Sequence, residues 1–143
     1  MSKHSEKNNE TAFNIINPKT LYDPTPFAYS HIAEVTKFNR IIHISGQSGE
    51  DISGSLSTDF HTQVKQTFEN IELALVAVDC SIADIAVLKV LIVDHNTDKH
   101  EILIQESQRI WGNLPFPTCT LIPVPCLAIS DMQIEIDATV YVL

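Results

Sequence analysis

The stretch DFHTQVKQTFENIELALVAV (59–78), followed closely by IAVLKVLIV (85–93), decides the fold class of this chain. In the first segment, apolar residues recur every three or four positions, as on one face of an amphipathic helix. That stripe is formed by Phe60, Val64, Phe68, Ile71, Leu75 and Val78. Ser57 or Thr58 can supply the oxygen that caps the first turn. The second segment is almost wholly apolar and short enough for a buried strand, so the pair indicates an α/β domain.

The chain after this pair predicts one more helix and two more strands. The second helix is expected from Thr97, as its N-cap, to about Trp111, with Gly112 at its end. A strand is expected over 118–124, where prolines end it. Residues 132–142 alternate between apolar and polar side chains, which is the pattern of a strand with one buried face.

The chain before the first helix predicts further strands. Residues 13–16 alternate weakly and are expected to form a first strand, and three prolines in 17–27 indicate a loop. Two stretches rich in β-branched residues, 31–38 and 40–45, flank the turn residue Asn39 and predict a β-hairpin.

This order of elements predicts an α/β (α+β) domain with one mixed β-sheet and two helices packed on one face. Residues 12–143 are expected to form that single domain, because neither a repeat nor a linker divides them. Residues 1–11 are polar and charged, so we expect them to be a disordered tail.

The composition favours a cytoplasmic protein and argues against nucleic-acid binding. The formal net charge of −9 repels phosphate backbones, and no run of Lys and Arg offsets it. Three cysteines without a signal peptide indicate reduced thiols, and no apolar stretch is long enough to span a membrane. The six histidines lack the spacing of zinc ligands, so no metal is expected.

Several short motifs, in a fixed order, resemble those of the RidA/YjgF family. Each motif is weak alone, whereas the ordered set with fitting spacings is fairly specific. The set comprises Ala28-Tyr29-Ser30, Ser45-Gly46-Gln47, the helical pattern Gln63, Gln66, Phe68, Asn70 and Ile71, the segments 80–84 and 90–94, and Ile134-Glu135-Ile136.

The resemblance implies a chorismate-mutase-like fold and a homotrimer with a ligand cleft between each pair of subunits. Archetypal members hydrolyse enamines and imines to 2-keto acids and ammonia, without metal or organic cofactor. By the same resemblance, Glu135 faces the cleft and positions a water for attack. Tyr29 and Ser30 would line the rim of the cleft. Ser45 and Gly46 would bring a backbone N–H to a ligand oxygen.

The chain departs from the family at the residue that binds the substrate carboxylate. Family deaminases carry an arginine after a Pro-Ala pair on the next-to-last strand, and its guanidinium clamps that carboxylate. Here the matching stretch is PTCTL (117–121), and counting back from Glu135 aligns Cys119 with the arginine. No Arg or Lys lies between Gly112 and the C-terminus. Cys119 and Leu121 have the same strand parity, so a cleft built there would be more apolar than the archetype.

The sequence leaves three functional hypotheses. In the first, the clefts bind a small metabolite that is more apolar or less anionic than an imino acid. In the second, the protein is a divergent deaminase that uses Glu135 and water, oriented by Tyr29 and backbone donors. An arginine reaching the cleft from elsewhere, such as Arg40 or Arg109, would favour this enzyme. The third, a ribonuclease or translation inhibitor, is disfavoured by the acidic composition.

Each candidate residue also has an ordinary structural explanation. Glu135 can be a solvated or interface carboxylate, Gly46 a strand-end turn, and Tyr29 and Ser30 simple loop packing. Cys119 fits a small buried hydrophobe better than a nucleophile, because no neighbouring cation in the sequence would lower the pKa of its thiol.

Overall fold

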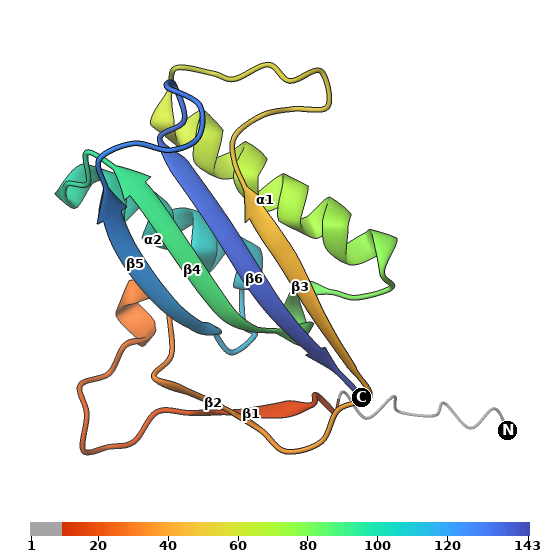
Figure 1. Cartoon of the computed structure of the whole chain (residues 1–143). Coiled ribbons are helices and arrows are strands. Elements are labelled where there is room, and N and C mark those ends of the chain that lie inside the picture. Colours follow the sequence, from red (N-terminus) through yellow and green to blue (C-terminus); the bar gives the residue numbers. More distant parts are fainter. Residues whose placement is uncertain (1–9) are drawn as a thin grey trace, which may run out of the picture.

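The computed structural model describes residues 10–143 and contains a central β-sheet with two α-helices packed on it (Figure 1). The elements are β1 (Phe13–Ile16), the 3₁₀ turn η1 (Thr25–Phe27), β2 (Ile32–Val35), β3 (Arg40–Gln47), α1 (Phe60–Ala77), the 3₁₀ turn η2 (Ile82–Asp84), β4 (Ile85–Val93), α2 (Thr97–Trp111), β5 (Thr118–Val124) and β6 (Ile134–Val142). Of the tail expected at 1–11, residues 1–9 lie outside the described part of the chain.

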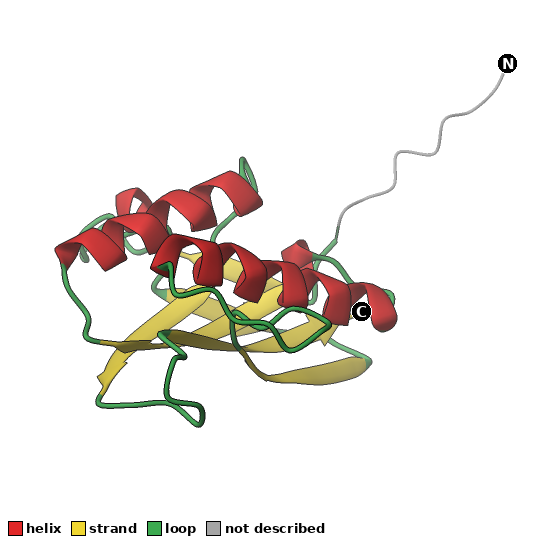
Figure 2. Cartoon of the chain, turned by 90° about the horizontal axis from the view of Figure 1, so that it is seen from above, coloured by secondary structure: helices red, strands yellow, loops and turns green. Residues whose placement is uncertain are grey.

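Four strands form the central sheet in the order β3-β6-β4-β5. β4 is parallel to β5 and antiparallel to β6, which is in turn antiparallel to β3. Both helices cover the same face of this sheet (Figure 2). The predicted mixed sheet with two helices on one face is therefore confirmed, with β1 and β2 forming an additional two-stranded sheet.

The hydrophobic core lies between this face and the helices. The inward residues of β6 are at most 2% exposed, as the alternation in 132–142 predicted; they are Ile134, Ile136, Ala138 and Val140. From α1, Phe68, Ile71 and Leu75 pack into the same core cluster and are equally buried. Each of these side chains other than that of Ala138 stabilises the fold by roughly 1.5–3 kcal/mol relative to its exposed state. This packing fixes both helices against the sheet.

The predicted hairpin between 31–38 and 40–45 is wrong. β2 pairs with β1, and β3 pairs with β6. The backbone N–H of the expected turn residue, Asn39, donates to the carbonyl of Val142 at 2.8 Å, so Asn39 begins the β3–β6 ladder. β-branched composition shows that a segment is extended, but the choice of partner depends on which strand can bury its apolar face.

Both helices are capped one or two residues away from the expected position. The N-cap of α1 is Asp59 rather than Ser57 or Thr58, and its carboxylate accepts a backbone N–H of the first turn at 2.9 Å. The N-cap of α2 is Asn96 rather than Thr97, and its side-chain amide oxygen likewise accepts a backbone N–H of the first turn. In both cases the longer side chain reaches the free N–H groups of the first turn.

The face of the sheet opposite the helices carries a mixture of charged and apolar side chains. Lys89 on β4 stands opposite Asp137 on β6 in the register of the sheet. Ile41, Val87 and Ile122 point to the same side from three strands and are 46%, 40% and 40% exposed. We refer to this side as the open face.

Candidate functional site

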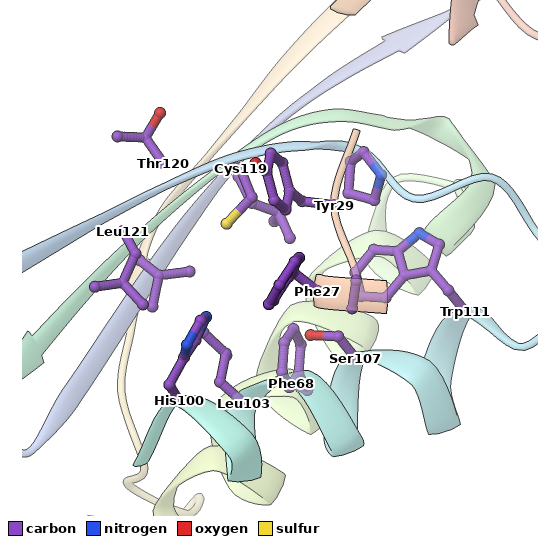
Figure 3. A pocket seen from close by; sticks show the side chains of 14 residues that line it. Phe27, Tyr29, Phe68, His100, Leu103, Ser107, Trp111, Cys119, Thr120 and Leu121 are labelled. Atoms are coloured by element: carbon purple, nitrogen blue, oxygen red, sulfur yellow. The ribbon is translucent and has the colours of Figure 1, made fainter. Parts of the chain in front are cut away.

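A cavity of about 320 Å³ lies between β5, α2 and the loop that contains η1 (Figure 3). The cavity is mainly apolar, and aromatic rings form much of its wall. Its lining consists of Phe27, Ala28, Tyr29, Phe68, Leu88, Val90, His100, Leu103, Ser107, Trp111, Pro117, Cys119, Thr120 and Leu121.

Cys119 and Leu121 form the wall of the cavity that β5 contributes. Because the two residues are two positions apart on one strand, both side chains point toward α2, whereas that of Thr120 between them points away (Figure 3). Burial raises the pKa of the Cys119 thiol to about 12. The thiol is therefore neutral at physiological pH and is not an activated nucleophile.

The loop around η1 brings Phe27 and Tyr29 to the cavity. Ala28 adopts a left-handed conformation with φ of 59°, and its N–H donates to the carbonyl of Thr25, which ends the 3₁₀ turn. The N–H of Ser30 then donates to the carbonyl of Pro117 at 3.0 Å. This bond attaches the loop to the start of β5, beside Cys119.

Ser30 itself does not line the cavity. It is 2% exposed, and its hydroxyl accepts a hydrogen bond from the side-chain amide of Asn17 at 3.2 Å. Ser30 therefore holds the loop in place, while its neighbour Tyr29 faces the cavity.

One face of α2 supplies the opposite wall, through His100, Leu103, Ser107 and Trp111. The sequence pattern predicted the helix but did not identify His100 and Ser107 as site residues. Their spacing of three and four positions is that of a single helix face. The signal available in the sequence was the presence of these two polar residues on a helix face that also carries apolar residues.

Ser45, Gly46 and Glu135 lie elsewhere, where β3 meets β6. A β-bulge between Ile44 and Gln47 interrupts the ladder beside them. The Glu135 side chain covers Gly46, where there is no room for a β-carbon. Glu135 belongs to the open face by strand parity, whereas Cys119 belongs to the helix-covered face. Within one chain, the predicted site residues therefore form two separate groups.

The two arginines that could have replaced the missing one are engaged elsewhere. Arg40 donates to the carbonyl of Val78 at 3.0 Å. Arg109 makes a double contact with Glu106 at 2.8 Å. Among the described residues, none that lines the cavity is Lys, Arg, Asp or Glu.

Within residues 10–143, no three His, Cys, Asp or Glu side chains come together in a way that could hold a metal ion. No helix in this part of the chain has the length and apolarity needed to cross a membrane.

Residues 24–142 match the profile of the family described as Endoribonuclease L-PSP. The chain belongs to this family, whose members include the Rid proteins. The RutC family protein YjgH of Escherichia coli (strain K12) is 28% identical over 100 residues, which cover 70% of this chain and 76% of YjgH.

Solved Rid structures share the fold. YyfB from Yersinia pestis, described as a protein of unknown function of the conserved Rid family, has a TM-score of 0.87 and 27% identity, covering 92% of this chain and 99% of YyfB. E. coli TdcF, solved with bound serine, has a TM-score of 0.62 and 23% identity, covering 81% of this chain and 94% of TdcF. At that identity, the TdcF match shows the fold alone.

Proposed function

We propose that this Rid protein is a homotrimer whose intersubunit clefts bind a small metabolite that is uncharged or weakly polar. We also propose that it lacks the 2-imino acid deaminase activity of the archetypal family members. One observation carries the proposal: Cys119, which the sequence motifs align with the family's arginine, is a neutral thiol in a cavity whose lining contains no Lys or Arg.

The energetics of an anionic substrate support this view. A carboxylate that enters an apolar cavity loses its hydration and needs charged hydrogen bonds in return. A guanidinium supplies two of them in one planar contact, and a neutral thiol supplies neither. A ligand without a charge avoids that loss and gains from contact with the apolar wall.

The open face supports assembly with further copies. Its exposed isoleucines and valine would be buried by a partner, and members of the family are generally homotrimeric. In such a trimer, the Glu135 group of one subunit and the Cys119 cavity of the next can share one cleft. Analytical ultracentrifugation tests the assembly, and a monomer at micromolar concentration would contradict it.

The alternative function is an enamine or imine deaminase that uses Glu135 and water. The observation in its favour is that, among the described residues, no hydrogen-bond donor contacts the Glu135 carboxylate. An unpaired carboxylate can accept a proton from a water as that water attacks an imine carbon. The serine bound to TdcF is compatible with either function, since it indicates that this fold can hold a small molecule.

Imine hydrolysis decides between the two functions. 2-Iminopropanoate is generated in situ in the presence of semicarbazide, and the protein competes with this trap if it is a deaminase. We expect no competition from the native protein and a gain of activity in Cys119→Arg, with Cys119→Ala as the matched control. Activity in the native protein that is lost in Glu135→Ala would overturn the proposal in favour of the deaminase.

A further inference from the structure

The cavity beside Cys119 is lined by five aromatic rings in different orientations. Phe68 and Trp111, 1% and 2% exposed, form an edge-to-face pair with their centroids 5.9 Å apart. Phe27 and His100 are nearly parallel, at 5°, with centroids 6.3 Å apart. Tyr29 completes the set. Ring faces and ring edges attract other rings more specifically than they attract aliphatic groups.

The cavity is also lined by a serine hydroxyl for which the structure shows no hydrogen-bond partner within residues 10–143. Ser107 is 7% exposed, and its hydroxyl oxygen points into the cavity (Figure 3). No described residue forms a hydrogen bond with it. Thr67, the comparable buried hydroxyl on α1, donates to the carbonyl four residues earlier at 2.7 Å. The Ser107 hydroxyl is thus free to bond a ligand.

The volume of about 320 Å³ limits the size of that ligand. A cavity of about 150 Å³ lined by apolar side chains binds benzene, so this one has room for two fused rings. The lining has no Lys or Arg to pair with a carboxylate and no Asp or Glu to pair with an ammonium group, so either charge would lose hydration there without an ion-pair partner of these types.

We propose that this cavity binds an uncharged, planar aromatic ligand of one or two fused rings, with a single hydrogen-bonding group that bonds Ser107 Oγ. This inference rests on the proposed function, because it names the class of ligand for the same cavity. The rings contact the aromatic wall, and the polar group meets the Ser107 hydroxyl.

Four matched probes test the proposal by calorimetry on the full-length protein: 2-naphthol, naphthalene, 2-naphthoate and decahydro-2-naphthol. They share a carbon skeleton and differ in hydroxyl, charge and aromaticity. We expect 2-naphthol to bind tightest, and 2-naphthoate and the saturated alcohol to bind at least about tenfold more weakly. Trp111 is the chain's one tryptophan, so its indole NMR signal, in protein labelled with ¹⁵N-tryptophan, reports binding inside the cavity.

The variant Ser107→Ala tests the hydrogen bond. We expect it to weaken 2-naphthol binding about tenfold and to leave naphthalene binding within about twofold. Ser130→Ala, which removes an exposed hydroxyl outside the cavity lining, is the control and should change neither. Thermal melting confirms that both variants are folded.

The possible failures are distinguishable. If no probe moves the Trp111 signal, or if 2-naphthoate binds tightest, the proposed function itself fails. If the saturated alcohol binds as tightly as 2-naphthol, a neutral-ligand site remains but its aromatic selectivity is wrong. If Ser107→Ala weakens naphthalene and 2-naphthol equally, Ser107 is not the bonding partner.

Discussion

The side chain of Glu135 lies directly over Gly46, and a β-carbon built on Gly46 would be 2.7 Å from Cγ of Glu135. Non-bonded contacts this short are essentially never made by a real β-carbon, so one of the two groups would have to move. The glycine therefore provides the space in which the glutamate rests, at the bulge where β3 passes β6. Gly46 and Glu135, which belong to two different family motifs, therefore form one structural unit.

We expect Gly46→Ala to lower the free energy of unfolding by about 0.5–1.5 kcal/mol, because the new methyl group forces the flexible Glu135 side chain out of its rotamer. Glu135→Ala in the same chain should restore most of that loss, and urea denaturation of both single variants and the double variant measures the coupling. Gly49→Ala is the control. Its β-carbon would press against the backbone of Gln63, so Glu135→Ala should not relieve it. Strict additivity at Gly46 and Glu135 would contradict the contact.

The raised pKa of Cys119 predicts slow alkylation. With a pKa of about 12, about one Cys119 thiol in ten thousand is ionised at pH 8. Only the thiolate reacts with iodoacetamide, so the folded protein should be labelled at the exposed Cys126 long before Cys119. Mass spectrometry of the peptides follows both sites, and denaturant should remove the difference. Equal rates in the folded protein would show that the cavity activates the thiol.

Glu106 joins α1 to α2 and should make stability depend on pH. Burial raises the pKa of its carboxyl, but hydrogen bonds from His61 and Arg109, both at 2.8 Å, together outweigh burial and leave the pKa below its ordinary value. A lowered pKa stabilises the folded state above the ordinary carboxyl pKa of about 4.3, and this stabilisation is lost as the pH falls through the native value.

The variant Glu106→Gln should therefore be less stable by about 1–2 kcal/mol at pH 7. The difference from the native protein should shrink as the pH falls below about 4. Glu101→Gln, an exposed carboxylate on the same helix, is the matched control and should have little effect. Thermal melting at several pH values measures both. A difference that stays constant down to pH 3 would rule out the lowered pKa.

Gln63 is fully buried, and its amide connects two loops to α1. Its Nε2 donates to the carbonyls of Ser57 and Asp131 at 2.7 and 2.9 Å, and its Oε1 accepts the N–H of Gln133 at 2.9 Å. Gln63→Leu leaves these backbone groups without a partner and should cost about 2–4 kcal/mol.

Hydrogen exchange gives an independent check on this network, because the Gln133 amide should lose protection in the Gln63→Leu variant. Gln66→Leu, which removes only a bond to Asn70 within the same helix, should cost less than about 1 kcal/mol. If the two variants are equally stable, the connection through Gln63 does not contribute to the fold.

The elements that could be predicted from the sequence are those whose burial pattern is local. The alternation in β6 and the apolar stripe of α1 identify their buried faces without knowledge of a partner. The pairing of β2 could not be predicted, because its four residues fit several neighbours and the longer β6 takes β3. The caps were missed for a related reason, since the reach of the Asp59 and Asn96 side chains depends on the exact start of each helix.

The residues of the candidate site likewise divide into those that could be predicted from the sequence and those that could not. Strand parity alone indicated that Cys119 and Leu121 point to one side, and both line the cavity. The contribution of α2 was missed, because His100 and Ser107 gain their role from facing β5 across the cavity. The positions of Tyr29 and Glu135 depend on a loop bond and on a bulge, neither of which has a periodic signature.

β5 is an edge strand of the four-stranded sheet, and Pro123 within it has no backbone N–H to donate. Pro125, just beyond the strand, lacks one as well. Edge strands with free donors can template amyloid-like growth, and proline is a common defence. The other edge strand of the four-stranded sheet, β3, has no proline, so the part of it before the bulge keeps its outward N–H donors. Aggregation of a partly unfolded chain should therefore begin at β3, and a proline placed on that outer edge would be the first change to try when this protein is kept concentrated for long periods.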